Sequence, residues 1–282
     1  PTSSMTNLLR TCLIPLAALL LLLTGICQAQ EPVQEPAPLL SNPRESLRQS
    51  GISSFTKGAL SNIVIRGYQR ENIMITFDGV PYFGAAPFRG DAGPFIVNNS
   101  DVSRIIVTKG PYNLRSPGAA GGSIEVSSPD NLKRFSARTS FSYGSYDSFD
   151  GTAVLGIGNP LADFTAGYTG RSGGVPDGGD GQPLTRTSYP NANNNYRPGS
   201  EDLPMYRLDT FWLKGGINPT SQSRFELSYS FLQGNEIKFP TQNFDMSDEQ
   251  VHRLQGRLTI RKISSVVREV SLQGWWSQAL SR

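Results

Sequence analysis

The sequence predicts a fold dominated by β-strands, and three observations support this fold class. First, only 37% of the 282 residues are hydrophobic and 17% are charged; Gly, Ser, Thr, Asn and Pro fill the difference, which is typical of a chain with many turns. Second, apolar and polar residues alternate over several segments of roughly ten residues, the pattern of a strand with one apolar face. Third, short and long links between these segments alternate along the chain.

Residues 1–29 have the features of a signal peptide. Met5 is the expected start, after four extra upstream residues, and Arg10 provides the positive charge of the first region. Leu13–Ile26 is an apolar run of 14 residues, and Cys27-Gln28-Ala29 offers small residues at positions −3 and −1 of a cleavage site. A membrane-spanning helix needs about 20 apolar residues, so a cleaved signal is favoured over an uncleaved anchor.

Both cysteines, Cys12 and Cys27, lie in this segment, so the exported chain would contain no thiol and no disulfide. Residues 30–49 include four prolines and few apolar residues, and we expect a flexible lead-in there. At its end, Glu45–Ser50 is expected to form a short helical stretch with Asn42 as its cap.

The next segment, residues 50–131, contains four runs with strand character. These runs are Ile63–Ile65, Ile73–Phe77, Arg104–Thr108 and Ser123–Ser127. Their Val, Ile and Thr residues favour extended backbone. The second run ends at Asp78-Gly79, a pair typical of a tight hairpin turn. A stretch rich in Gly, Pro and Ala separates the last two runs.

Residues 132–282 contain about seven segments in which apolar and polar residues alternate. They cover Phe135–Tyr143, Ser148–Ile157, Asp163–Tyr168, Tyr206–Ile217, Arg224–Phe231, Arg253–Arg261 and Glu269–Trp276. A β-sandwich gives the same alternation. The lengths of the links between the segments are therefore needed to distinguish a sandwich from a transmembrane barrel.

Three links are short, and they alternate with longer, polar ones. The short links are Asn159–Leu161, Asn218–Ser223 and Ile263–Ser265. The links that alternate with them are Gly173–Leu203 and Gly234–Glu249, which are long, and Gly144–Asp147, which is short. Up-and-down transmembrane barrels have short turns at one end and long loops at the other. Aromatic residues near the strand ends fit an interfacial girdle: Tyr143, Tyr146, Tyr206, Trp212, Trp275 and Trp276.

Four motifs add a resemblance to a known family. They are Ile63-Val64-Ile65-Arg66-Gly67, Phe77-Asp78-Gly79-Val80-Pro81, Val102–Pro111 and Gly118–Ile124. In this order, and followed by amphipathic strands, they resemble the N-terminal part of a TonB-dependent outer-membrane receptor. The resemblance implies a signal peptide (1–29), a lead-in (30–49), a small α/β plug domain (50–131) and the first seven or so strands of an antiparallel transmembrane β-barrel (132–282). The implied fold is dominated by β-structure, with an incomplete barrel.

The sequence departs from the family pattern in several places. Ile106 stands where the family often has Glu, and Lys109 stands where it often has Arg. Leu114–Pro117 replaces the usual aromatic-Gly step, and the energy-coupling segment is not recognisable between Gln30 and Gly58. The family closes its barrel with more strands than this chain supplies, and an open sheet edge in lipid leaves backbone groups unpaired. We therefore expect the sequence to be a truncated or partial reading frame.

The resemblance implies energy-coupled uptake of a large, scarce nutrient, such as an iron–siderophore complex, across the outer membrane of a Gram-negative cell. Expected partners are outer-membrane lipid, an inner-membrane coupling protein of the TonB type, and a small-molecule or metal-chelate ligand. By the same resemblance, Tyr82–Asn99 forms the plug apex. Within it, the candidate ligand contacts are Tyr82, Phe83, Phe88, Arg89 and Asn98, because aromatic faces stack and a guanidinium binds anionic groups.

Eleven residues are assigned structural roles as plug-motif positions. They are Arg66, Gly67, Asp78, Gly79, Pro81, Arg104, Lys109, Gly110, Pro111, Gly121 and Gly122. Of these, Arg66 and Lys109 are expected to make polar contacts between plug and barrel wall rather than to bind ligand.

Other function classes are less well supported. The only histidine, His252, has no partners in the sequence for a catalytic triad, so no enzyme and no cofactor are expected. The net charge of +3 and the lack of a basic cluster argue against nucleic acid. Asp177 and Asp180, among glycines, are a weak calcium candidate, and no other metal site is expected. The alternative from another class is a secreted β-sandwich adhesin or carbohydrate-binding module.

Overall fold

The computed structural model describes residues 33–35, 53–57, 60–69, 72–81, 102–111, 119–128, 134–185, 204–238 and 245–282. The signal peptide, the helical stretch expected at Glu45–Ser50 and the segment Tyr82–Asn99 lie outside these residues. By its contacts the chain divides into two compact units, residues 1–33 and 34–282. All the regular elements of the described residues are strands, and no helix among them is long and apolar enough to cross a bilayer.

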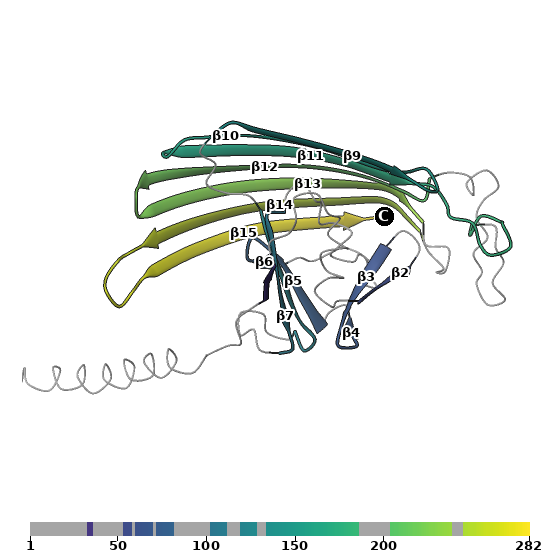
Figure 1. Ribbon diagram of the computed structural model, residues 1–282, viewed down its shortest axis with the longest axis horizontal. Coiled ribbons are helices and arrows are strands. Elements are labelled where there is room, and N and C mark those ends of the chain that lie inside the picture. The colour runs from purple at the N-terminus through teal and green to yellow at the C-terminus, as the bar shows by residue number, and fades with distance from the viewer. Residues whose placement is uncertain are drawn as a thin grey trace, which may run out of the picture. The chain divides into compact units, whose positions relative to one another are not determined.

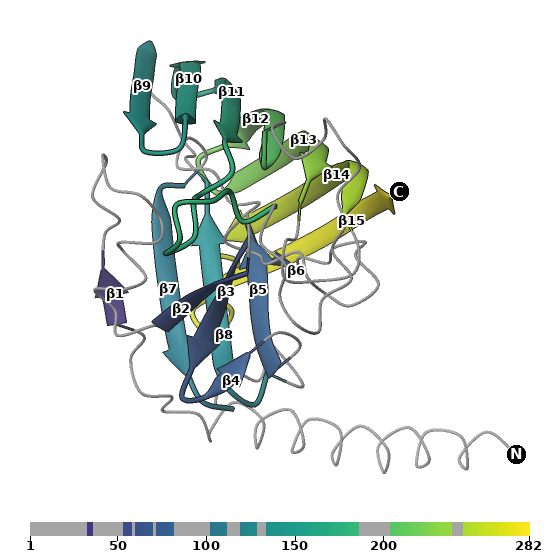
Figure 2. The same cartoon turned by 90° about the vertical axis from the view of Figure 1, so that its right-hand side faces the viewer.

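Two small sheets form in the N-terminal part of the second unit (Figure 2). A three-stranded sheet contains β2 (Ser53–Lys57), β3 (Leu60–Ile65) and β4 (Tyr68–Gln69). A five-stranded sheet in the order β1-β7-β8-β5-β6 contains β1 (Val33–Glu35), β5 (Ile73–Phe77), β6 (Val80–Pro81), β7 (Arg104–Lys109) and β8 (Gly122–Ser127). The four runs with strand character are therefore strands, and β1 adds a short extended piece within the segment expected to be a flexible lead-in.

One apolar core joins the two small sheets. It contains Ile63, Ile65, Ile73, Val102, Ile105, Val107, Ile124 and Val126. The core is possible because β3, β5, β7 and β8 each direct alternate side chains to one side. Within the five-stranded sheet, β8 pairs antiparallel with β7 and parallel with β5. The two strands that flank the Gly-rich stretch in sequence are thus neighbours in space.

Gly122, the first residue of β8, occupies a position that a side chain cannot. Its φ is +141°, and a Cβ atom there would lie 2.3 Å from the main-chain oxygen of Thr108. Because the close contact is with backbone, no rotamer change can relieve it. Gly122 therefore allows β8 to lie close against β7, which explains its place in the sequence motif.

The remaining strands form one antiparallel sheet in which chain order and spatial order coincide (Figure 1). Its seven strands are β9 (Ser136–Gly144), β10 (Ser148–Gly158), β11 (Ala162–Gly173), β12 (Tyr206–Thr220), β13 (Ser223–Ile237), β14 (Met246–Arg261) and β15 (Glu269–Ser281). Each strand pairs with the next along the chain. This is the up-and-down arrangement that the link lengths predicted, and a Greek-key sandwich does not have it.

One predicted link is shorter than expected. The sequence indicated a loop over Gly234–Glu249, but β13 continues to Ile237 and β14 begins at Met246, and these two residues pair. The reason is apolar packing that the polar composition of the segment conceals. Ile237 and Met246 are buried in a cluster at this end of the sheet with Met205, Leu208, Leu232 and Val251.

From β10 to β14, the buried face of the seven-stranded sheet carries many polar side chains, and the exposed face carries apolar ones. Phe164 is 47% exposed, whereas its neighbours Asp163 and Thr165 are 7% and 3% exposed. In β13, Phe225 is 42% exposed while Arg224 is 4% exposed. A sheet of a water-soluble protein buries the opposite face. We call the face on which Asp163, Thr165 and Arg224 lie the inner wall.

We expect Gly122→Ala to lower the free energy of unfolding of the complete protein by roughly 2 kcal/mol or more, because the new methyl group overlaps backbone. Thermal denaturation of the purified protein measures this loss. Gly67→Ala is the matched control: its φ is +83°, but nothing lies within 4 Å of the added Cβ. It should cost only the backbone strain, about 1 kcal/mol. Equal losses in the two variants would contradict the close-contact explanation.

Candidate functional site

The turn between β5 and β6 is the centre of the candidate site. Asp78 and Gly79 have φ values of 50° and 82°, as a two-residue hairpin turn between twisted strands requires. The backbone amide of Ser128 donates to Asp78 Oδ1 at 2.8 Å, and the Ser128 hydroxyl donates to Oδ2 at 2.6 Å. The turn is thereby fixed to the residue that follows β8, and both side chains are buried.

The inner wall holds the same turn from the other side. Lys214 Nζ, from β12, donates to Ser128 Oγ at 2.9 Å and lies 3.6 Å from Asp78 Oδ2. The main-chain oxygen of Asp78 accepts hydrogen bonds from Arg257 Nη2 and from Gln273 Nε2, the latter at 2.8 Å. Gln255 Nε2 lies 3.5 Å from that oxygen. Side chains from three wall strands therefore converge on one hairpin turn.

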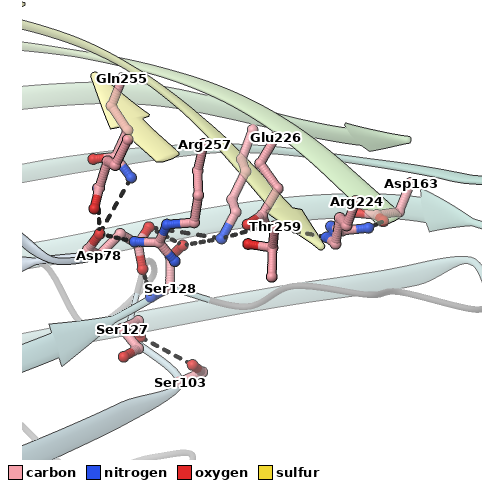
Figure 3. Close-up of polar contacts among 12 residues, drawn as sticks. Asp78, Ser103, Ser127, Ser128, Asp163, Arg224, Glu226, Gln255, Arg257 and Thr259 are labelled. Atoms are coloured by element: carbon pink, nitrogen blue, oxygen red, sulfur yellow. Dashed lines mark hydrogen bonds and ion pairs between the residues drawn. The ribbon is translucent and has the colours of Figure 1, made fainter. Parts of the chain in front are cut away.

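A row of ion pairs continues from this turn along the inner wall. Figure 3 shows Asp78 and Ser128 at one end of the row, Glu226 in the middle and Arg224 with Asp163 at the other end. Arg224 donates to both oxygens of Asp163, at 2.7 and 3.1 Å. This two-pronged geometry is the strongest form of the pair. Gly216 of β12 makes the contact possible: it pairs with Asp163 of β11, and a Cβ atom there would overlap the guanidinium of Arg224, which crosses β12 to reach Asp163.

Glu226 connects the two ends of the row, and its contacts are looser. Its Oε1 atom lies 3.2 Å from Arg224 Nε and 3.5 Å from Lys214 Nζ. Neither contact has hydrogen-bond geometry, and this oxygen has no hydrogen-bond partner. Lys214 is thus shared between a carboxylate of the wall and a carboxylate of the hairpin. The four wall residues of the row carry two positive and two negative charges, so they are neutral without Asp78.

A small cavity of about 50 Å³ adjoins the hairpin turn. Its lining includes Phe77, Trp212, Lys214, Arg253 and Gln255. The guanidinium carbon of Arg253 lies 5.4 Å from the centroid of the Phe77 ring, which is cation–π geometry. A cavity of this size, with charged groups among its lining residues, has room for a few water molecules.

The plug-motif residues fall into three groups. Asp78, Gly79 and Pro81 form the hairpin at the site. Gly110, Gly121 and Gly122 are buried where β7 meets β8, and the Gly110 amide donates to the Gly121 carbonyl at 2.8 Å. The remaining positions are exposed: Arg66, Gly67, Arg104, Lys109 and Pro111. Wall contact by Arg66 and Lys109 stays a prediction, and the contacts that the structure describes come from Asp78.

The five candidate ligand contacts, Tyr82, Phe83, Phe88, Arg89 and Asn98, lie outside the described residues. Sequence reasoning missed the wall residues Lys214, Arg224, Arg257 and Gln273. A signal for them existed, since all four occupy polar positions in alternating strands. A buried Lys or Arg on that face needs a partner, and the partner could not be identified from alternation alone.

The candidate calcium loop is closed by its own hydrogen bonds. Asp180 Oδ1 accepts from the Gln182 amide at 3.1 Å, and Asp177 bridges to Pro183. Within the described part of the chain, no three His, Cys, Asp or Glu side chains gather as metal ligands. His252 lies on the apolar face, where its Nδ1 is 2.8 Å from the Tyr229 hydroxyl and its ring contacts Phe231.

The chain is similar to known proteins in part of its sequence and in its fold. A family model described as TonB-dependent Receptor Plug Domain matches residues 29–123. No curated protein sequence matches the chain. Among solved structures, the copper transporter OprC matches with a TM-score of 0.74 and 20% identity, covering 89% of this chain and 37% of that one.

Two further structures have the same fold. The ferric yersiniabactin uptake receptor FyuA from Yersinia pestis matches with a TM-score of 0.62 and 16% identity, over 88% of this chain and 40% of that one. The FrpB iron transporter from Neisseria meningitidis matches with a TM-score of 0.62 and 16% identity, over 84% and 38%. The chain spans less than half the length of each of these proteins. Residues 29–123 match the plug domain of TonB-dependent receptors, and the strands that follow have the fold of the barrel strands in these structures, which supports a TonB-dependent receptor.

We expect Arg224→Met to destabilise the complete receptor by about 3 kcal/mol or more, because it leaves Asp163 buried without its cation. The matched control is Arg207→Met, which also removes an Arg–Asp contact, at 3.3 Å, but from a side chain that is 69% exposed. That change should cost less than about 1 kcal/mol. Thermal unfolding in detergent compares the two, and losses of equal size would show that the inner-wall row does not stabilise the sheet.

Proposed function

We propose that this chain forms the plug and part of the barrel wall of an outer-membrane receptor for energy-coupled uptake of a large, scarce nutrient. The observation that carries the proposal is the hairpin turn held by the polar face of a sheet whose other face is apolar and exposed. An apolar outer face suits lipid, and a polar inner face suits a water-filled passage. The plug then obstructs that passage until it moves.

The nature of the nutrient is inferred from the relatives. The matched structures are named as a copper transporter, an iron transporter and a ferric yersiniabactin uptake receptor. We infer by analogy a metal-containing nutrient such as an iron–siderophore complex, bound by the apex segment Tyr82–Asn99 and the outer loops. The division into signal peptide (1–29), lead-in (30–49), plug (50–131) and barrel strands (132–282) belongs to the same proposal.

The contacts at Asp78 suggest how the plug is held and released. Asp78 is one of several polar groups that link the hairpin to the wall, and Lys214 keeps Glu226 as a second partner. Withdrawal of the hairpin therefore leaves no unpaired lysine in the wall, which lowers the cost of separation. We infer that a pull from an inner-membrane protein of the TonB type opens the passage by breaking these contacts.

The alternative, a secreted β-sandwich module, fits the structure less well. A sandwich buries the apolar faces of two sheets against each other. Here Leu155, Phe164 and Leu272 are 59%, 47% and 71% exposed on the apolar face. Membrane fractionation distinguishes the two hypotheses, because a receptor is recovered with the outer membrane and needs detergent, whereas a secreted module stays soluble.

We expect cells that carry the complete receptor, and lack their other iron receptors, to accumulate ⁵⁵Fe from at least one of a panel of ferric siderophores or hemin. Uptake should stop when a protonophore collapses the proton gradient or when the TonB-type protein is deleted. Binding at the cell surface should persist under both conditions, since it needs no energy. Accumulation that continues without the gradient would exclude energy coupling.

A second prediction concerns the apex segment. Arg89→Ala should weaken binding of the recognised nutrient roughly tenfold or more, because a charge-assisted hydrogen bond to an anionic group is lost. Equilibrium binding to whole cells measures this change. Arg66→Ala, which removes an exposed plug arginine from the β3–β4 turn, is the matched control and should bind normally. Unchanged affinity in Arg89→Ala would remove this residue from the site.

A further inference from the structure

The carboxylate of Asp78 occupies a site that is built like a receptor for anions. Three donors face it: the backbone amide of Ser128 at 2.8 Å, the Ser128 hydroxyl at 2.6 Å and the ammonium of Lys214 at 3.6 Å. The amide donates to one oxygen of the carboxylate and the hydroxyl donates to the other. Asp78 and the two residues that supply these donors are buried, with exposures of 6–7%. This is the geometry with which proteins bind a carboxylate of any origin.

The surroundings of the site are positively charged. Lys214 and Arg257 approach the hairpin turn from the wall, and among the described residues Glu226 is the wall carboxylate that lies against Lys214. When the Asp78 carboxylate leaves, these three wall side chains carry a net charge of +1. A positive excess on the wall of a passage attracts anions and raises their local concentration.

The adjoining cavity gives a second anion room to approach. It measures about 50 Å³ and reaches Lys214, Arg253 and Gln255 directly, with Trp212 and Phe77 as apolar walls. An incoming carboxylate could therefore contact Lys214 before Asp78 has left. The exchange costs little electrostatically, since one carboxylate replaces another beside the same ammonium group.

We propose that Lys214 and its neighbours form a carboxylate-binding site on the inner wall, which Asp78 fills while the plug is in place and which a carboxylate of the transported nutrient fills as the hairpin withdraws. This inference rests on the proposed uptake function and specifies its substrate class as a carboxylate-bearing nutrient. The same site then has two roles. It holds the plug, and it receives an anionic group as the passage opens.

Chemical rescue with acetate tests the site in the complete receptor, purified in detergent. Asp78→Gly deletes the carboxymethyl group and keeps a residue that tolerates the positive φ of the turn. It should lower the melting temperature by roughly 5 °C, because Ser128 loses its acceptor and Lys214 loses one of its two neighbouring carboxylates. Sodium acetate, exchanged for sodium chloride at constant ionic strength and pH, should restore at least half of the loss in a saturable way.

Two control variants make the result specific. Asp78→Gly/Lys214→Met lacks the ammonium group and should show no recovery with acetate. Asp147→Gly removes another aspartate with positive φ, in the exposed β9–β10 turn, and should not respond either. No acetate-specific gain in folded Asp78→Gly, or an equal gain in the double variant, would overturn the proposal.

A second variant keeps the test decisive if Asp78→Gly does not fold. Asp78→Asn retains the shape of the side chain and removes its charge, so acetate then competes with a neutral amide for Lys214. A saturable rise in melting temperature is again expected, at higher acetate concentration, and its absence would count against the site. The acetate experiment measures stability and not uptake. Absence of the acetate effect therefore does not contradict the uptake proposal, and failure of uptake does not contradict an acetate effect that is observed.

Discussion

Charged side chains on the inner wall are buried, and each has to find an opposite charge there, since an unpaired buried charge costs several kcal/mol. The row Asp163–Arg224–Glu226–Lys214 meets this requirement across three neighbouring strands. It works only if β11, β12 and β13 pair in one register, because a shift by one residue would turn every charge to the apolar face. The ion pairs and the strand register therefore depend on each other.

The hairpin turn at Asp78 makes use of the same row. A turn with positive φ at both central residues leaves its main-chain oxygen and its aspartate side chain free to make contacts in different directions. The oxygen accepts from Arg257 and Gln273, and the carboxylate accepts from Ser128 beside Lys214. Because Glu226 stays close to Lys214, the wall tolerates loss of the hairpin better than a single exclusive pair would. That property fits the proposed withdrawal of the plug.

Stability and release are assigned to different contacts of this network. The two-pronged bond of Arg224 to Asp163 lies wholly within the wall, and it has short distances and good geometry. The contact between Lys214 and Asp78, at 3.6 Å, connects wall and hairpin and is longer. A force on the plug would thus break the weaker contacts and leave the wall unchanged. The apolar cluster of Leu208, Leu232, Ile237, Met246 and Val251 stabilises the loop end of the same sheet independently of these charges.

The sequence alone determined the seven alternating strands and the tight turn at Asp78-Gly79, because each follows from residues that are close in the chain. It also indicated the plug domain through four short motifs in a fixed order. It mistook the polar segment Gly234–Glu249 for a loop, since the pairing of Ile237 with Met246 depends on an apolar cluster assembled from several strands.

Only the tertiary structure decided which groups meet at the hairpin. Asp78 and Arg257 are 179 positions apart, and Ser128 and Lys214 are 86 apart. Alternation tells which face a side chain occupies, but the height along the strand and the curvature of the sheet decide its partner. The physical reason is that strand formation is set by local periodicity, whereas a buried charge selects its partner from all the groups that folding brings within a few ångströms.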